Sequence, residues 1–225
     1  MAKPEKQNSV VKQDETVNSR RKFFKKAGTV AAAAPLAGFP MISVAQSPIV
    51  MKMQGAWGAT DIFNEMAEEY VKRVNDMAGG RLRIDFLVGG SVVKPFELTD
   101  AVSNGVLDAG HQVSAYWYGK TKVASLFGTG PVTGANSDQM LGWIQRGGGI
   151  ELYDELLKNL NLNIKGFFAF PMPPQPLGWF KQSPPKNGEE MKGYKYRTVG
   201  LATDLMQELG MSVTQLPGGE IMPAM

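Results

Sequence analysis

The feature that most restricts the fold of this chain is a regular alternation of short apolar segments with amphipathic ones between residues 48 and 113. The apolar segments have the pattern of strands, and the segments between them have apolar residues at helical spacing. We expect strands at 48–54, 82–88 and 108–113, and helices from Thr60 to Gly79 and from Pro95 to Asn104. Strand–helix–strand–helix–strand order predicts an α/β fold with a largely parallel sheet.

The second half of the sequence continues in the same style after a Gly/Pro-rich loop at 128–134. A continuous apolar run over 164–170 predicts a strand that is buried on both faces. The further elements expected are helices at 137–146, 150–160 and 201–209, and strands at 177–181, 195–199 and 212–216.

The N-terminus has the pattern of an export signal. Ser19-Arg20-Arg21-Lys22-Phe23-Phe24-Lys25 is similar to the twin-arginine motif, and an Ala/Gly-rich stretch runs from there to Ala45. Small residues at 43 and 45 favour cleavage after Ala45. Two prolines in the apolar stretch argue against the alternative of a transmembrane anchor. A basic arm that binds nucleic acid is the other alternative, but such arms lack a cleavage site.

The charge of the chain is unevenly distributed. The formal net charge is +3, but residues 1–45 hold eight basic and three acidic residues, which leaves 16 basic and 18 acidic residues in 46–225. The mature chain is therefore mildly acidic, and nucleic acid is not an expected partner. The sequence has no cysteine and one histidine, His111, which excludes disulfides, thiolate metal sites and multi-histidine metal sites.

Several short motifs are out of register. Gly119-Lys120-Thr121 lacks the earlier glycine of a phosphate-binding loop, and the glycines that begin at Gly128 do not match a dinucleotide fingerprint. No Gly-x-Ser-x-Gly segment occurs, which counts against a secreted α/β hydrolase. We expect His111 to be a packed residue at a strand end.

Four collinear segments carry more information: 114–120 (SAYWYGK), 174–180 (PQPLGWF), 192–200 (KGYKYRTVG) and 216–221 (LPGGEI). Together they resemble the solute receptors of tripartite ATP-independent periplasmic (TRAP) transporters. The match is nearest the branch that binds 2-oxo or 2-hydroxy monocarboxylates. This resemblance implies a two-lobed periplasmic-binding-protein clamshell of α/β class.

The resemblance also implies roles for individual residues. Arg197 matches the arginine that pairs with the substrate carboxylate, and a guanidinium at a strand end suits that task; a surface salt bridge is the alternative. Gln175 matches a residue that helps to bind a metal cation, Na⁺ or Ca²⁺, which bridges ligand and protein; a solvated loop residue is the alternative. Tyr116, Trp117, Tyr118 and Trp57 are expected to line the cleft or, equally, to pack in the core. Strand alternation would send Tyr116 and Tyr118 together and Trp117 away.

The predicted protein is a receptor and not an enzyme. It would be exported to the periplasm, bind a small organic acid anion and deliver it to the membrane subunits of a TRAP permease; a homodimer is compatible with the family. A clamshell sensing module that signals to a membrane partner is the alternative. The predicted divisions are 1–45 (twin-arginine signal peptide), 46–168 (first α/β lobe) and 169–225 (start of the second lobe). Because the last residues look like the first turn of a helix, we expect the C-terminal part of the clamshell to be missing.

Overall fold

The structure is a computed structural model, which describes residues 47–225 except 129–135, 170–171, 173–175 and 182. The chain divides into two units, of which the second is Gln46–Met225. The description below concerns the second unit. No helix of the described residues is both long enough and apolar enough to cross a membrane.

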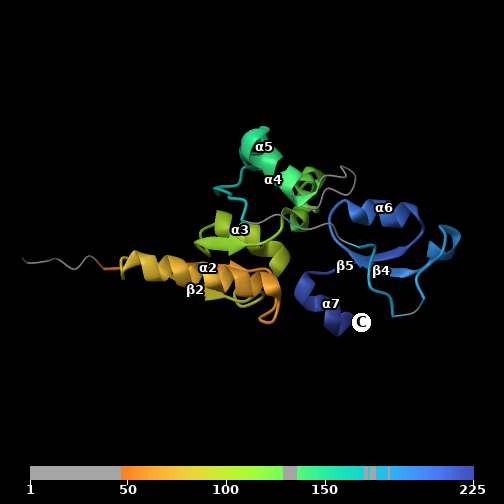
Figure 1. Ribbon diagram of the computed structural model, residues 1–225, viewed down its shortest axis with the longest axis horizontal. Coiled ribbons are helices and arrows are strands. Elements are labelled where there is room, and N and C mark those ends of the chain that lie inside the picture. Colours follow the sequence, from red (N-terminus) through yellow and green to blue (C-terminus); the bar gives the residue numbers. More distant parts are fainter. Residues whose placement is uncertain (1–46, 129–135, 170–171, 173–175, 182) are drawn as a thin grey trace, which may run out of the picture. The chain divides into compact units, whose positions relative to one another are not determined.

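The first sheet has three parallel strands. β1 (Ile49–Gly55) lies between β2 (Leu82–Leu87) and β3 (Ala109–His111). The connection from β1 to β2 is α2 (Ile62–Ala78), which runs beside β2 in Figure 1. The predicted parallel α/β arrangement of this part is confirmed.

The ends of α2 follow local rules. Asp61, one residue after the predicted start, caps the helix by accepting a hydrogen bond from the Phe63 N–H at 2.9 Å. Gly79 ends it in the left-handed conformation, with φ of 55°. On the exposed side, i,i+4 ion pairs join Lys72 to Asp76 and Arg73 to Glu69.

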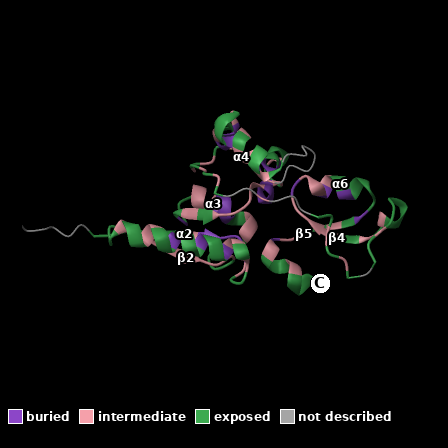
Figure 2. Cartoon of the chain, viewed as in Figure 1, coloured by how far each residue is buried: buried purple, intermediate pink, exposed green. Residues whose placement is uncertain are grey.

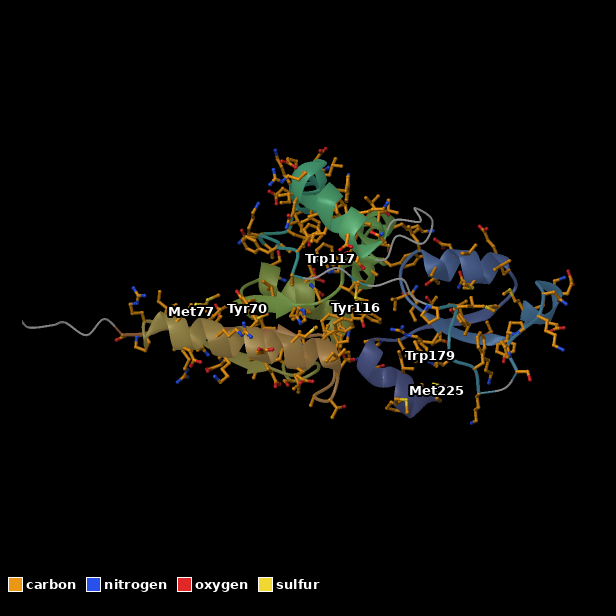
Figure 3. All side chains as sticks on the ribbon, in the orientation of Figure 1. Tyr70, Met77, Tyr116, Trp117, Trp179 and Met225 are labelled. Atoms are coloured by element: carbon orange, nitrogen blue, oxygen red, sulfur yellow. The ribbon has the colours of Figure 1, made fainter. Side chains whose placement is uncertain are left out.

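The apolar residues of α2 are only partly buried. The buried residues of the helix are Asn64, Ala67 and Val71. Four apolar side chains of α2 are exposed: Ile62, Met66, Tyr70 and Met77. Figure 2 shows the exposed face of the helix in green, and Figure 3 labels Tyr70 and Met77. Gly55 leaves room for the buried asparagine, because a Cβ at residue 55 would lie 2.6 Å from the Asn64 Oδ1.

Short helices connect β2 to β3 and continue after β3. The elements are η1 (Pro95–Glu97), α3 (Leu98–Ser103), η2 (Ser114–Trp117), η3 (Lys122–Phe127), α4 (Ser137–Arg146) and α5 (Gly149–Asn159). The start of α4 has a capping box between Asn136 and Gln139. Aromatic packing then ties these helices into one core, in which Phe127 lies 5.2 Å from Tyr153 between ring centroids.

Two predicted strands are wrong. The described residues of 164–170 form no strand; Ile164 and Phe168 pack on the core and Phe167 is 85% exposed. No described segment pairs with these residues, so their apolar pattern gives packing without a ladder. The described residues of 177–181 are also irregular. There the Tyr196 hydroxyl donates to the Leu177 carbonyl, a group that a neighbouring strand would otherwise use.

The second sheet is a short parallel pair. β4 (Lys195–Thr198) pairs with β5 (Ser212–Gln215), and α6 (Ala202–Glu208) connects them and lies along both strands in Figure 1. All three elements were predicted. The remaining helical turns are η4 (Glu189–Met191), η5 (Gly218–Glu220) and α7 (Ile221–Ala224). The lobe boundary predicted after residue 168 stays a prediction.

Candidate functional site

Arg197 lies near the carboxyl end of β4, beside the segment that leaves β5. Its Nε donates to the Leu216 carbonyl at 2.8 Å, and its Nη2 donates to the same oxygen. In the parallel pair, Arg197 is aligned with Thr214, two residues before Leu216. Both strands therefore end at the guanidinium, which is where open α/β sheets place their ligands.

Arg197 has an unusual environment for a cation. Of the lysines and arginines that the structure describes, it is the only one that is not exposed. None of the described acidic side chains forms an ion pair with it. Burial lowers the pKa of Arg197 while Tyr116 raises it. Because arginine stays protonated in proteins, the site carries a half-buried positive charge that no described carboxylate neutralises.

Tyr116 is the second polar group of the site. Its hydroxyl accepts a hydrogen bond from the Gly218 N–H at 2.9 Å, and its ring meets Phe96 edge-on at 4.9 Å. Burial raises the pKa of Tyr116, while the Gly218 N–H and the Arg197 guanidinium act in the opposite direction. The hydroxyl thus receives donors from the protein and keeps its own proton for an acceptor.

Trp57 forms the wall next to Tyr116, at 6.5 Å between ring centroids. A Cβ on Gly218 would lie 3.1 Å from the Trp57 Cδ1, so only glycine lets the backbone of residue 218 approach the indole this closely. On its other side, Trp57 packs against His111 at 4.7 Å. Burial lowers the pKa of His111 to about 4, with Asp61 acting the other way, so the imidazole is a neutral packing group at pH 7.

The prediction that Tyr116 and Tyr118 point the same way is wrong, because residues 114–117 form a 3-10 helix and not a strand. Three residues per turn send the three aromatic side chains in different directions. Trp117 is buried and stacks on Tyr153 at 6.0 Å. Tyr118 instead donates to the Asp204 carboxylate of α6 at 2.6 Å. Of the three aromatic residues, Tyr116 alone faces Arg197.

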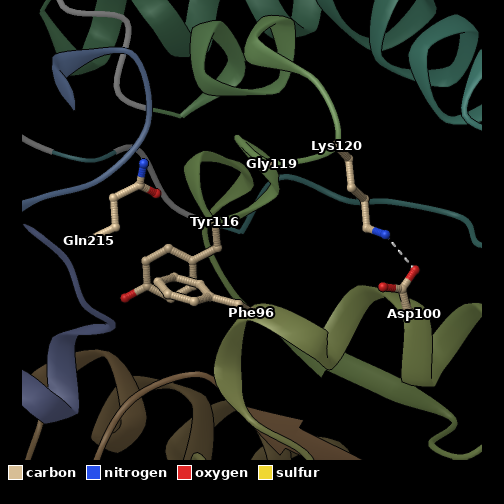
Figure 4. A pocket seen from close by; sticks show the side chains of 6 residues that line it. All are labelled: Phe96, Asp100, Tyr116, Gly119, Lys120 and Gln215. Atoms are coloured by element: carbon tan, nitrogen blue, oxygen red, sulfur yellow. Dashed lines mark hydrogen bonds and ion pairs between the residues drawn. The ribbon is translucent and has the colours of Figure 1, made fainter. Parts of the chain in front are cut away.

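A cavity of about 260 Å³ opens beside Tyr116, as Figure 4 shows. Phe96 and Tyr116 form its aromatic wall, and Lys120 and Asp100 form an ion pair of 2.7 Å at its rim. Gln215, the last residue of β5, also lines it. Sequence reasoning missed Phe96, Gln215 and the rim pair. The sequence contains a signal for Gln215 alone, because this residue directly precedes the Leu-Pro-Gly-Gly segment.

Gln175, the predicted metal ligand, lies outside the described residues. Within the described part of the chain, no group of three or more His, Cys, Asp or Glu side chains could hold a metal ion. Asp100 is the one carboxylate among the residues that line the cavity, and it is paired with Lys120.

Comparison with protein families gives a match to the model of bacterial extracellular solute-binding protein, family 7, over residues 53–225. A curated monocarboxylate 2-oxoacid-binding periplasmic protein of Nostoc sp. PCC 7120 is 37% identical over 155 residues, which cover 69% of this chain and 42% of that protein.

Two solved structures are also similar. A TRAP transporter solute binding protein from Bordetella bronchiseptica RB50, a mixed occupancy dimer with copurified calcium and picolinate, is 30% identical with a TM-score of 0.72. A TRAP periplasmic solute binding protein from Pseudoalteromonas atlantica T6c, with bound sodium and pyruvate, is 28% identical with a TM-score of 0.67. The alignments cover 80% and 79% of this chain and 52% and 53% of those chains. The chain thus spans about half the length of these relatives, and the likeness confirms the predicted α/β class and the TRAP receptor fold.

Proposed function

This chain belongs to family 7 of the bacterial extracellular solute-binding proteins, and we propose that it is the solute receptor of a TRAP transporter. Its ligand would be a small 2-oxo or 2-hydroxy monocarboxylate, which the receptor delivers to the membrane subunits of a permease. The proposal gives the protein no catalytic step. Ligand capture would shift the receptor towards a closed state that the permease recognises.

The observation that carries the proposal is the half-buried, unpaired charge of Arg197. A buried guanidinium without a carboxylate is costly, and an anionic ligand would remove that cost. The Leu216 carbonyl accepts from Nε and Nη2, and no described acidic side chain pairs with the guanidinium, so a ligand carboxylate would supply the missing negative charge. The Tyr116 hydroxyl would donate to the 2-oxo or 2-hydroxy oxygen.

The charge around the cavity favours a monocarboxylate over a dicarboxylate. Lys120 is the one lysine that lines the cavity, and Asp100 already neutralises it at 2.7 Å. A second carboxylate at that end would therefore gain little. Phe96 and the Tyr116 ring instead offer an apolar wall for an aliphatic ligand body.

We also propose that a metal cation binds together with the carboxylate. The two similar structures hold calcium with picolinate and sodium with pyruvate. By analogy we assign Gln175 as one ligand of a Na⁺ or Ca²⁺ ion here and leave its other ligands unassigned.

We further propose that the twin-arginine pathway exports the protein to the periplasm, that the signal is cleaved after Ala45, and that the receptor can form a homodimer.

The test is a thermal-unfolding titration of the intact protein with pyruvate, lactate and longer 2-oxoacids, each with and without Ca²⁺ or Na⁺. A ligand at one hundred times its dissociation constant should add about 2.7 kcal/mol to the free energy of unfolding. Arg197→Ala should remove this stabilisation. Arg146→Ala is the matched control, because Arg146 is exposed at the end of α4 and forms no ion pair among the described residues.

Two results would contradict the proposal. If none of these carboxylates raises the unfolding temperature, the chain is not a receptor for this ligand class. If Arg197→Ala keeps the full stabilisation of the unsubstituted protein, Arg197 is not the carboxylate-binding residue.

A further inference from the structure

A second charged cluster lies on the face of α6 that meets the η2–η3 region. The Asp204 Oδ1 accepts a hydrogen bond from the Tyr118 hydroxyl at 2.6 Å, and its Oδ2 lies 2.9 Å from the Lys122 Nζ. Lys122 also lies over the Tyr118 ring, 5.5 Å from the centroid. One carboxylate thus engages two groups from a segment about 80 residues earlier in the chain, and both of its oxygens are used.

The turn before α6 packs tightly next to this cluster. Gly200 has a φ of +68°, and a Cβ there would lie 2.9 Å from the Ser125 Oγ and 3.1 Å from the Ala115 Cβ. Ser125 and Thr203 are both buried. The β4–α6 turn therefore has close backbone packing on η2 and η3, and Asp204 lies at the edge of that contact.

This contact is connected to the anion site by short, structured segments. Arg197 precedes Gly200 by three residues, and Tyr116 precedes Tyr118 by two. The other side of the site is fixed by hydrogen bonds from Gly218 to Tyr116 and from Arg197 to Leu216. The contact at Asp204 thus joins α6 to the segment that carries Tyr116, in addition to the hydrogen bonds at Leu216 and Gly218.

We propose that Asp204 is a positioning residue of the anion site: through Tyr118 and Lys122 it holds the β4–α6 turn so that Arg197 stays at binding distance from Tyr116. The ligand-binding part of this inference rests on the proposed function. Asp204 itself touches neither the cavity nor Arg197 among the contacts of the described residues. It acts through the placement of the turn, and its loss should weaken binding without abolishing it.

The state of the carboxylate agrees with this role. The hydrogen bond from Tyr118 and the interaction with Lys122 lower the pKa of Asp204, so the group is ionised at neutral pH. The cluster is partly exposed, so its electrostatic part is screened by salt.

The first experiment is calorimetric titration of the intact protein with pyruvate in the presence of Ca²⁺. Asp204→Asn keeps an acceptor for Tyr118 and loses the charge, whereas Asp204→Ala loses both. We expect the dissociation constant to rise about threefold for Asp204→Asn and about tenfold for Asp204→Ala, the latter corresponding to about 1.4 kcal/mol. The double variant Tyr118→Phe with Asp204→Ala should bind pyruvate no more weakly than Asp204→Ala alone, because the two substitutions remove the same contact. Glu208→Gln, one turn later on α6 and exposed, should bind like the unsubstituted protein.

The second experiment needs no ligand. The sequence has no cysteine, so cysteines introduced at the exposed positions Lys158 in α5 and Gln207 in α6 accept spin labels without background. The distance distribution between the labels should be narrow in the parent protein. It should broaden with Asp204→Ala and stay narrow with Glu208→Gln.

The outcomes separate the two proposals. If none of pyruvate, lactate and the longer 2-oxoacids binds the parent protein, the proposed function fails, and the label distances alone decide whether Asp204 holds the turn. If pyruvate binds but Asp204→Ala changes neither affinity nor distances, the positioning role is overturned. A broadened distance with unchanged affinity, or weaker binding with an unchanged distance, overturns it as well, because positioning requires both effects together.

Discussion

Replacing Gly200 with alanine tests how closely the β4–α6 turn packs on η2 and η3. Two costs add at this position. The left-handed backbone, with φ of +68°, costs an alanine about 1 kcal/mol relative to glycine. The new Cβ would lie 2.9 Å from the Ser125 Oγ and 3.1 Å from the Ala115 Cβ, and overpacking of this kind costs a further ~1–3 kcal/mol. We therefore expect Gly200→Ala to lower the free energy of unfolding by about 2–4 kcal/mol.

Gly105→Ala separates the two costs. Gly105 has a φ of +74°, close to that of Gly200, but nothing lies within 4 Å of a Cβ placed there. This variant should show the backbone cost alone, about 1 kcal/mol. Both variants can be compared with the parent protein by urea unfolding, followed by tryptophan fluorescence. In thermal melts, each kcal/mol should shift the midpoint by about 2–4 °C.

The comparison has a clear failing result. If Gly200→Ala lowers the free energy of unfolding no more than Gly105→Ala does, residue 200 has room for a methyl group. The turn is then not tightly packed. Adding Ser125→Gly to Gly200→Ala removes the nearest obstructing atom. This double variant should recover part of the lost stability, whereas Ser125→Gly should give no recovery when combined with Gly105→Ala.

Two further predictions concern Tyr116 and His111. Tyr116→Phe leaves the Gly218 N–H without its acceptor and should cost ~1–3 kcal/mol in urea unfolding; an unchanged midpoint would show that the hydrogen bond does not form in solution. Burial lowers the pKa of His111 to about 4, whereas the unfolded chain should titrate near ~6.5. The unfolded chain therefore binds more protons between these values, and stability should fall by about 2 kcal/mol from pH 7.5 to pH 5. Most of this decrease should be absent in His111→Gln. Since His111 is the only histidine, an unchanged dependence of stability on pH in the variant would disprove that His111 causes the decrease.

Local patterns were sufficient for the elements that alternate regularly. The strands β1 and β2, the helix α2 and the unit β4–α6–β5 lie within one or two residues of their predicted bounds. The apolar run over 164–170 failed because periodicity reports which residues can be buried, and not whether a strand partner exists. Ile164 and Phe168 are packed on the core, as the pattern required, but the backbone has no ladder in the described residues.

The site was less predictable than the fold, because backbone groups hold two of its side chains in place. The Leu216 carbonyl and the Gly218 N–H fix Arg197 and Tyr116, and no side-chain pattern indicates either of them. Arg197 was proposed from a family resemblance, and the structure places it beside Tyr116 and the end of β5. Asp204 looks in the sequence like any acidic residue in the first turn of a helix, and only the tertiary contact distinguishes it.

The distribution of charge is compatible with the anion binding that we propose for this mildly acidic chain. Residues 46–225 hold 16 basic and 18 acidic residues, so long-range attraction cannot account for binding. The described ion pairs use exposed lysines and arginines, such as Lys120 with Asp100 and Lys122 with Asp204. Each such pair lies in water, where it contributes little. Arg197 differs in both respects, because it is half-buried and has no carboxylate partner among the described residues. Its charge acts at short range in a medium of lower dielectric constant, so a bound carboxylate gains more there than at any exposed cation.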